Sequence, residues 1–403
     1  PETMKGQDIL IGNETIEELI GMGFENVRCA ENENERIYTI ENNVYKAQGV
    51  GIAKAIEIIQ RQGLPSGKRC KVIVTHLEVP EMSLTYHPSN SNDSLSTNGN
   101  IGWETSYDVD GWKEVRKEKA KNSSRYKVDI LVYPQLSYKN LIITQIYQAL
   151  FTLNPAIEVS LLPGMKFTGQ IIIPIYNDGY SIYSDRVHPG YITLSQQFRL
   201  PYNIKGKATI GYFNADRYGA DLMLFRPFKA DERFSLEGRV GLVGIGYWDG
   251  FKLHYDTDMS WTWTVGANFY WPRYNTQFSL KGEQYLMGDR GVKFEMTRHY
   301  RYASIGFYAM KGKAEGVATI SLSNVAFSEK KATYNVLKSG DTNIDPAFNN
   351  YDGTKITSVQ VEYGKTATYT GATPHSCEQL HYAERSGRTR SESGHIIHGT
   401  GNA

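Results

Sequence analysis

The sequence predicts a mainly β protein, in which a transmembrane antiparallel β-barrel of roughly 12 strands follows a small N-terminal α/β domain. Three observations lead to this prediction. Apolar and polar residues alternate along many segments between residues 126 and 323. These segments run about 9 to 13 residues, close to the ~9–11 residues with which a tilted strand crosses a bilayer. Tyr and Gly are frequent, at 28 and 38 residues, and Tyr favours the boundary between membrane and water.

The composition narrows the class of protein further. The chain has 403 residues and a formal net charge of +1, so it lacks the basic stripe that nucleic-acid binding requires. No run of about 18 apolar residues occurs, so no transmembrane helix is expected. The chain begins at Pro1 without a Met or an apolar signal stretch, and we interpret it as a processed or trimmed product.

Residues 1–88 are expected to form the α/β domain. "NETIEELIGMGF" is predicted to be a helix with Asn13 as its N-cap, and "GVGIAKAIEIIQRQG" a helix with Ile52, Ile56 and Ile59 on one side. Single strands are predicted over "ENVRCA", "ERIYTIENNVYKA" and "KRCKVIVTHLEV". The isoleucine stripe is either the core of this domain or a surface for a partner protein, and an exposed edge strand would also allow docking.

The cysteines leave two interpretations open. Cys29 and Cys70 each lie near a predicted strand of the N-terminal region. They form either a disulfide, in an oxidising compartment, or two reduced thiols in the core. Cys377 would remain outside such a pair.

The rest of the chain divides by composition. Residues 89–125 are expected to be a linker or loop, because a Ser/Asn/Gly-rich stretch precedes the charge run "KEVRKEKAKNSSR". Residues 126–330 are assigned to the barrel. Residues 331–403 read as a loop, a further strand pair over "KITSVQVEYGKTATYT" and, from Gly371, a disordered tail.

The apolar side of the predicted strands is expected to face lipid. In "SWTWTVGANFYW", Trp261, Trp263, Phe269 and Trp271 fall on one face, opposite Ser, Thr, Gly and Asn. These aromatic residues are typical of a lipid-facing surface or of an interfacial girdle, although flat rings can also stack on sugars. A soluble β-sandwich with one wet face would explain the same alternation, but it explains the strand lengths less well.

The charged side of the strands is expected to face a lumen. Opposite charges at spacing i, i+2 lie on one face of a strand and can pair across a ladder. Such charges either fill a narrow lumen as a network of ion pairs or form a lining that contacts a charged glycan. The candidates are Glu237, Arg239, Lys281, Glu283, Lys293, Glu295, His299 and Arg301.

Signals for catalysis and metal binding are weak. His188, His254 and His299, with Ser181 and Ser184 in a loop, provide the residue types of a Ser–His hydrolase, but no GxSxG motif fixes a nucleophile. Asp341, Asn343 and Asp345 have the spacing that opens an EF-hand loop, yet Pro346 and Asp352 stand where that loop needs Gly and Glu. No cofactor, no metal and no catalytic residue is therefore assigned.

Several stretches, in order, resemble the YjbH family of outer-membrane exopolysaccharide proteins, which includes the group 4 capsule barrel proteins. "ENNVYKAQGVGIAKAIEII" is similar to the N-terminal module of that family. "VDILVYPQL", "LLPGMKFTGQIIIPIYND", "RYGADLMLFRPFKADERFSLEGRVGLV" and "GEQYLMGDRGVKFEMTRHY" resemble its barrel motifs. Family members are often longer, with a second barrel, and the part after about residue 325 does not follow the pattern.

The resemblance implies an outer-membrane barrel with its α/β domain in the periplasm. It implies a role in polysaccharide secretion, export or surface attachment, with outer-membrane lipid, a polysaccharide and periplasmic export proteins as partners. It implies no enzymatic activity. A plugged barrel that only holds partners, and an outer-membrane lipid hydrolase, are the alternatives.

Overall fold

The computed structural model describes residues 2–45, 48–65, 67–88, 103–139, 148–178, 185–213, 217–284, 290–299, 304–311, 319–323, 334–335 and 362–363. The chain forms two compact units, which meet in sequence between Arg125 and Tyr126. Each unit is described by itself. None of the described helices is long and apolar enough to cross a membrane.

The N-terminal unit is a five-stranded sheet with helices on both faces. Its strands are hydrogen-bonded in sequence order. Of the four described ladders, the one between β2 and β3 is parallel, because α2 connects these two strands as a crossover. Its elements are α1 (Glu2–Gly21), β1 (Glu25–Glu31), β2 (Glu35–Glu41), α2 (Gln48–Gln62), β3 (Arg69–His76), β4 (Val79–Tyr86), β5 (Trp103–Ser106) and α3 (Trp112–Val115).

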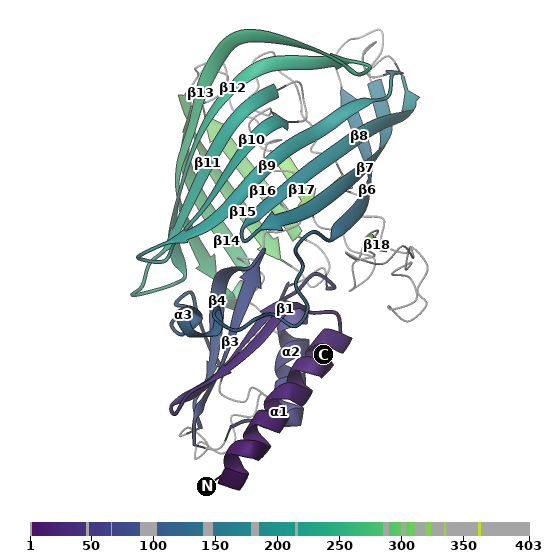
Figure 1. The fold of residues 1–403 in the computed structure, drawn as a ribbon. Helices are drawn as coiled ribbons and strands as arrows, with labels where there is room; N and C mark the ends of the chain where they lie inside the picture. The colour runs from purple at the N-terminus through teal and green to yellow at the C-terminus, as the bar shows by residue number, and fades with distance from the viewer. Residues whose placement is uncertain are drawn as a thin grey trace. The chain divides into compact units, whose positions relative to one another are not determined.

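Burial explains why these segments fold as they do. On α2, Ile52, Ile58 and Ile59 are buried and Ile56 is half-buried, so the isoleucine stripe belongs to the core. On the sheet, Ile37 and Ile73 pack with Val115 of α3. Residues next to them in β2 and β3 point to the opposite face, where α1 and α2 lie side by side (Figure 1).

Two expected elements of this unit were wrong. Helix α1 begins at Glu2, so Asn13 lies within the helix and is not its N-cap. "KRCKVIVTHLEV" was expected as one strand, but β3 ends at His76 and β4 starts at Val79. Leu77 and Glu78 form the turn between them, both with left-handed backbone, at φ 50° and 61°. Neither residue type favours this conformation, and the hydrogen bonds described below hold it.

The expected linker over 89–125 is also corrected for residues 103–125. These residues form β5, α3 and a segment that packs along β1, and they complete the N-terminal unit. The backbone nitrogen of Asn26 donates to the carbonyl of Asn122 at 3.0 Å, and Lys121 Nζ lies 3.1 Å from Glu17 Oε1. The charge run is therefore a solvated face of folded structure. Residues 89–102 lie outside the described part of the chain.

The cysteines of this unit are thiols. Cys29 is on β1 and Cys70 on β3, with β2 between them, and both are free. Burial is the main cause that raises the pKa of each thiol, to about 12. Of the two interpretations left open above, the structure supports reduced core thiols. Cys377 lies outside the described residues.

The second unit is one large antiparallel sheet, so the predicted mainly β class is confirmed. From β6 to β17, twelve strands are hydrogen-bonded in sequence order, and the short strands β18 and β19 both pair with β6. The strands are β6 (Val128–Lys139), β7 (Gln148–Leu162), β8 (Met165–Asn177), β9 (His188–Leu200), β10 (Ile204–Phe213), β11 (Arg217–Pro227), β12 (Phe234–Asp249), β13 (Lys252–Trp271), β14 (Thr276–Gln284), β15 (Arg290–His299), β16 (Ser304–Lys311), β17 (Thr319–Ser323), β18 (Tyr334–Asn335) and β19 (Glu362–Tyr363).

This sheet is strongly curved. Figure 1 shows it curling so that β14 to β17 lie behind β8 to β10. Short turns join the strands at one end, for example Pro163–Gly164 between β7 and β8 and the 3-10 turn Pro272–Tyr274 between β13 and β14. In the described part of the chain no ladder joins β17 to β6, so closure into a barrel stays a prediction.

Candidate functional site: the charged face of the large sheet

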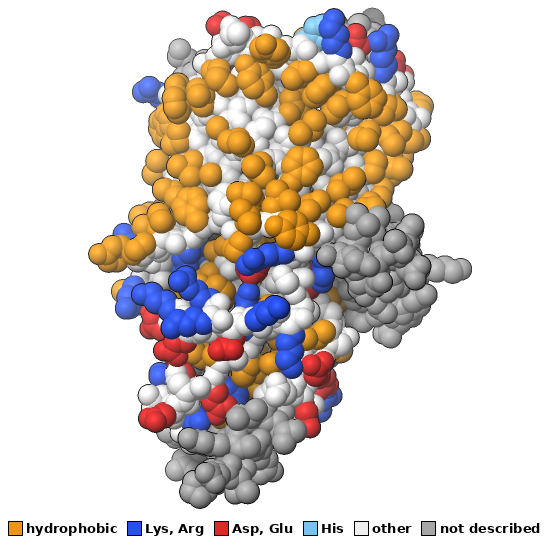
Figure 2. Space-filling view, viewed as in Figure 1, with side chains coloured by type: hydrophobic (Ala, Val, Ile, Leu, Met, Phe, Trp, Pro, Cys, Tyr) orange, Lys and Arg blue, Asp and Glu red, His pale blue; other side chains and the backbone are white. Residues whose placement is uncertain are grey.

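The two faces of the large sheet carry opposite kinds of side chain. On β13, Trp261 and Val265 are 59% and 63% exposed, whereas Thr262 and Asn268 are buried. Neighbouring strands repeat this pattern. Figure 2 shows apolar side chains over the part of the large sheet that faces the viewer. A sheet that buries polar side chains and exposes apolar ones has the reverse of the distribution found in a water-soluble protein.

A chain of ion pairs crosses the buried face from β12 to β15. Lys281 Nζ lies 2.9 Å from Glu237 Oε1 and 2.9 Å from Glu295 Oε2. Lys293 Nζ lies 2.8 Å from the other oxygen of Glu295. The amide of Asn268 also donates to Glu237, at 3.2 Å. Lys281 on β14 therefore contacts one carboxylate from the neighbouring strand β15 and one from β12, two strands away.

A glycine makes this arrangement possible. Glu237 on β12 and Lys281 on β14 are both in register with Gly266 on β13, the strand between them. A Cβ at position 266 would lie 3.0 Å from Lys281 Cγ and 3.1 Å from Glu237 Cγ. The missing side chain leaves the space through which the two charged side chains meet.

A second pair extends the cluster to β11. Arg239 Nε lies 2.5 Å from Asp221 Oδ2, and both side chains are buried. Together the two groups hold three acids and three bases, so their formal charges balance. We call this set the ion-pair cluster: Asp221, Glu237, Arg239, Lys281, Lys293 and Glu295.

Of the remaining lumen candidates, the structure describes the side chain of Glu283 alone. Glu283 is half-buried on the same face, in register with Thr264 and Gly291. His299 ends β15, but its side chain is outside the described residues, as is all of Arg301.

The predicted lipid-facing aromatics lie on the apolar face. Trp261 and Trp271 are 59% and 43% exposed, and Trp271 packs edge-on against Tyr274 at 4.7 Å. Trp263 is half-buried, and its indole nitrogen donates to Gln284 Oε1 at 3.1 Å. Phe269 is half-buried beside Phe234, with ring centres 4.7 Å apart. These four residues thus share one face, as the alternation predicts.

The sequence reasoning missed Asp221, Asn268 and Gly266. Asp221 stands among apolar residues in "YGADLMLF", on the same face of β11 as Met223, and its alternation with Leu222 was the signal available. The role of Gly266 had no signal in the sequence, because it depends on which residues lie opposite in the two flanking strands.

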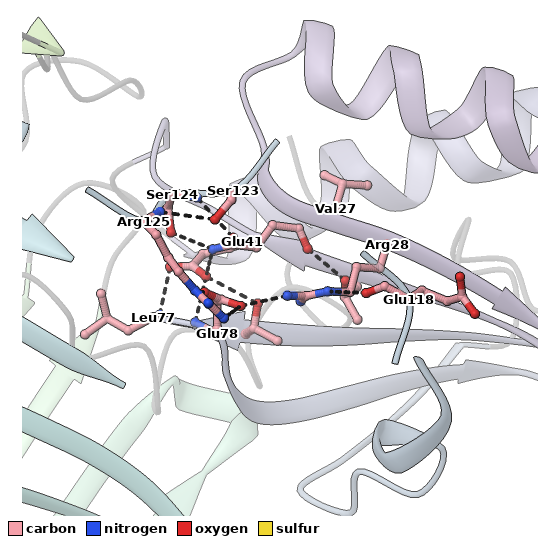
Figure 3. Close-up of polar contacts among 12 residues, drawn as sticks. Val27, Arg28, Glu41, Leu77, Glu78, Glu118, Ser123, Ser124 and Arg125 are labelled. Carbon is pink, nitrogen blue, oxygen red and sulfur yellow. Dashed lines mark hydrogen bonds and ion pairs between the residues drawn. The ribbon is translucent and has the colours of Figure 1, made fainter. Parts of the chain in front are cut away.

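A separate polar cluster holds the β3–β4 turn in the N-terminal unit (Figure 3). Glu41 is fully buried, and its two oxygens accept from the backbone nitrogens of Leu77, at 2.7 Å, and Glu78, at 3.1 Å. The amide of Asn26 donates to Glu41 at 2.7 Å and to Ser124 Oγ at 2.7 Å. Burial raises the pKa of Glu41 and is the largest influence on it. The hydrogen bonds lower the pKa but do not cancel the effect of burial.

Glu78 ties the same turn to the last residues of the unit. Its carboxylate lies 2.7 Å from Arg28 Nη2 and 2.5 Å from Arg125 Nε. Burial alone would raise the pKa of Glu78, but the hydrogen bonds from Arg125 and Arg28 outweigh it, so the pKa is lowered. The cluster therefore fixes the backbone at Arg125, where the chain leaves the unit.

The residues proposed for a hydrolase do not assemble in the described part of the chain. Nδ1 of His188 lies 2.9 Å from the carbonyl of its neighbour Pro189, and His254 stacks on Tyr247 at 5.1 Å. Ser181 and Ser184 lie outside the described residues, as do Asp341, Asn343 and Asp345. Among the described residues no group of His, Cys, Asp and Glu is arranged to hold a metal ion.

Comparisons with known proteins leave the family open. No family model and no curated protein matches the chain. The outer membrane protein opdK from Pseudomonas aeruginosa matches 49% of this chain with 11% identity and a TM-score of 0.29, and the match spans 60% of that protein. A loop-deletion mutant of OmpT, an outer membrane protein of Vibrio cholerae, matches 49% of this chain and 84% of its own, with 7% identity and a TM-score of 0.25. Similarity this low carries no argument about function.

Proposed function

We propose that the large sheet is the transmembrane β-barrel of an outer-membrane protein that takes part in exopolysaccharide or capsule secretion and assembly. The N-terminal unit would lie in the periplasm and contact export proteins there. The protein would act physically, as a route or an anchor, and would catalyse no reaction.

The location in a membrane is supported by the large sheet, which exposes apolar side chains on one face and buries charged side chains on the other. Val265, Trp261 and Leu280 are 57–63% exposed, while Lys293 on the opposite face is 2% exposed. In water this distribution would leave a large apolar area uncovered. In a bilayer it is stable, because the apolar face meets lipid and the ladder satisfies the backbone polar groups.

The polysaccharide part is supported by the resemblance to the YjbH family. Four of the five stretches that carry it fall on the large sheet, on β6 and on the hairpins β7–β8, β11–β12 and β14–β15. Asp221, Glu237, Arg239, Lys293 and Glu295 of the ion-pair cluster lie within these stretches. The stretches that carry the resemblance therefore include five of the six residues of the ion-pair cluster.

A plugged anchor is the second candidate, and the ion-pair cluster favours it. Lys281, Lys293 and Arg239 are each less than 10% exposed, so this part of the wall is packed rather than open to water. A filled interior is expected of small barrels, and a channel of large ones. In this case the barrel would hold a partner or a polysaccharide at the surface without letting it pass.

Conductance in a planar bilayer separates these functions. Glu283→Ala removes a charge from the buried face outside the ion-pair cluster, and Glu232→Ala, in the β11–β12 turn, is the matched control. Steady conductance that changes with Glu283→Ala but not with Glu232→Ala would support a conduit. Stable insertion without conductance would support the anchor. Failure to insert would contradict the proposal.

The link to polysaccharide needs its own experiment. Deleting the gene in its host and measuring surface and secreted polysaccharide tests it directly. We expect less polysaccharide at the surface, restored by the wild-type gene. If the amount of polysaccharide does not change although the wild-type protein inserts correctly, the role in secretion is contradicted, while the proposed barrel is not.

A further inference from the structure

The far ends of β12 and β13 form a hairpin that extends beyond the neighbouring strands. In the described residues, β11 pairs with β12 only as far as Ile245, and β14 pairs with β13 only as far as Trp263. Beyond these points the two strands pair with each other, and Figure 1 shows them arching past the other strands. We call residues 246–255, at the end of this hairpin, the flap.

The ladder is interrupted where the flap begins. Gly244 is in register with Met259, and the next paired residue of β12, Gly246, is in register with Tyr255. Three residues of β13, Asp256 to Asp258, therefore stand opposite Ile245 alone, and all three are exposed. A bulge of this kind breaks the ladder and bends the strand. Glycines on the facing strand add freedom at the same point.

Among the described residues, side chains rather than a ladder hold the flap to the rest of the sheet. Trp248 packs edge-on against Tyr212 of β10, with ring centres 5.5 Å apart, and the Tyr212 hydroxyl donates to the Gly246 carbonyl at 3.1 Å. Arg186 Nη1 lies 2.6 Å from Asp249 Oδ1 at the tip. Tyr218 of β11 donates to the Asp256 carbonyl at 2.6 Å, within the bulge.

We propose that the flap turns as a unit about the bulge at Asp256–Asp258 and closes on β10. Its latch would consist of the Trp248–Tyr212 contact and the Asp249–Arg186 pair. An ion pair whose side chains are 67% and 39% exposed is weak and screened by salt, so such a latch can open. Opening uncovers Tyr212, which is 7% exposed when Trp248 covers it. Tyr212 is in register with Ile192 of β9, which is 38% exposed, so the site that the flap covers lies on the apolar face of the sheet.

A disulfide trap tests the closed position. Arg186→Cys and Asp249→Cys are combined with Cys377→Ser, while Cys29 and Cys70 stay because burial keeps them unreactive. Under mild oxidation in detergent we expect most molecules to form the disulfide. Trp248→Ala should slow its formation about fivefold or more, since the aromatic contact that aligns the flap is lost. The matched control, Phe251→Ala at the tip, removes a ring that is 69% exposed and should leave the rate unchanged.

Two results would contradict the proposal that the flap closes on β10. A disulfide needs closer Cα atoms than an arginine ion pair does, so a short bis-maleimide cross-linker is used in parallel; absence of both links would mean that the tip does not rest against position 186. An equal rate with and without Trp248 would mean that the hairpin is a rigid extension with no latch. Where Trp248→Ala fails to fold, Tyr212→Phe removes only the hydroxyl contact to Gly246 and should still slow the reaction. The assay needs neither insertion nor transport, so it stays readable if the proposed function fails.

Discussion

Lys281 and Glu237 form an ion pair although their strands, β14 and β12, are not neighbours. The 2.9 Å contact passes over Gly266 on the strand between them. In a pleated sheet such a pair is normally blocked by the side chain of the middle strand. Because Gly266 has no side chain, charged residues of β12, β14 and β15 can join in one set of ion pairs.

Replacing Gly266 tests this relationship. Gly266→Ala would place a Cβ 3.0–3.1 Å from the side chains of both Lys281 and Glu237, so one of them must move and the ion pair weakens. We expect a loss of about 1–3 kcal/mol in the free energy of unfolding, measured by thermal or denaturant unfolding in detergent. Gly282→Ala is the control, because its nearest neighbouring atom would be 3.9 Å away. Equal effects of the two variants would speak against a special role for Gly266.

Lys281 should matter more to stability than Lys293. Lys281→Met removes a cation from two carboxylates, those of Glu237 and Glu295, whereas Lys293→Met removes the cation that lies 2.8 Å from Glu295. Breaking a buried ion pair by removing one partner costs about 3–5 kcal/mol, so Lys281→Met should lower the free energy of unfolding by at least that range and Lys293→Met by less. Denaturant unfolding of the two variants in the same detergent provides the comparison. The opposite order would show that the pair between Lys281 and Glu237 contributes little.

Much of the large sheet could be predicted from the alternation along the chain. Side chains of a strand point to opposite faces in turn, so the alternation alone separates Lys281 and Lys293 from Trp261 and Trp271. It cannot predict which charges meet, because that depends on the register between strands that the alternation leaves open. The Lys281–Glu237 contact is the clearest example.

The secondary structure of the last part of the N-terminal unit, residues 103–125, was harder to predict from the sequence. Residues 103–125 resemble a linker because their charges and small polar residues are also typical of disordered chain. They fold because a few residues pack against distant parts of the unit: Val115 with Ile37 and Ile73, and Arg125 with Glu78. Contacts between residues far apart in the sequence leave no periodic signal in a short segment.

A charge on the apolar face distinguishes a membrane barrel from a soluble sheet. Val265 is 63% exposed and lies within the apolar surface, so Val265→Lys should lower the stability of the inserted protein by about 2–4 kcal/mol if that surface meets lipid. Folding into lipid vesicles at increasing denaturant measures this. The control is Tyr255→Lys in the flap, which is 66% exposed and should have a smaller effect. A neutral Val265→Lys would favour a sheet surrounded by water.

Acid should destabilise the N-terminal unit through Glu78. Its pKa is lowered in the folded protein, so its stabilising contribution is present above the unfolded pKa of about 4.3 and is lost as the pH falls through the folded pKa. We expect the urea midpoint of the helical circular-dichroism signal to fall between pH ~7 and pH ~3.5, and Glu78→Gln to remove much of that fall. Glu57→Gln, at a solvated position on α2, should leave the fall intact. A wild-type midpoint that does not change with pH would contradict this assignment.

Glu41 should control the backbone of the β3–β4 turn. Leu77 and Glu78 donate to different oxygens of its carboxylate, and Gln offers only one oxygen acceptor. In Glu41→Gln we expect the amide of at least one of these two residues to exchange about tenfold faster, the equivalent of one lost hydrogen bond of ~1.4 kcal/mol. Hydrogen exchange followed by mass spectrometry measures it, with the solvated Glu33→Gln as control. Unchanged protection of both amides would show that the turn holds itself.

The order of strands in the large sheet bears on how the chain reaches this structure. From β6 to β17 every ladder joins strands that follow each other in the sequence, so each pairing closes only a short loop. A chain of this kind has a low contact order for an all-β protein, and strands can be added one after another from any hairpin that forms first. Only the pairings of β18 and β19 with β6 join distant parts of the chain. Among the described ladders of this sheet, these two have the largest entropic cost, and we expect them to form last.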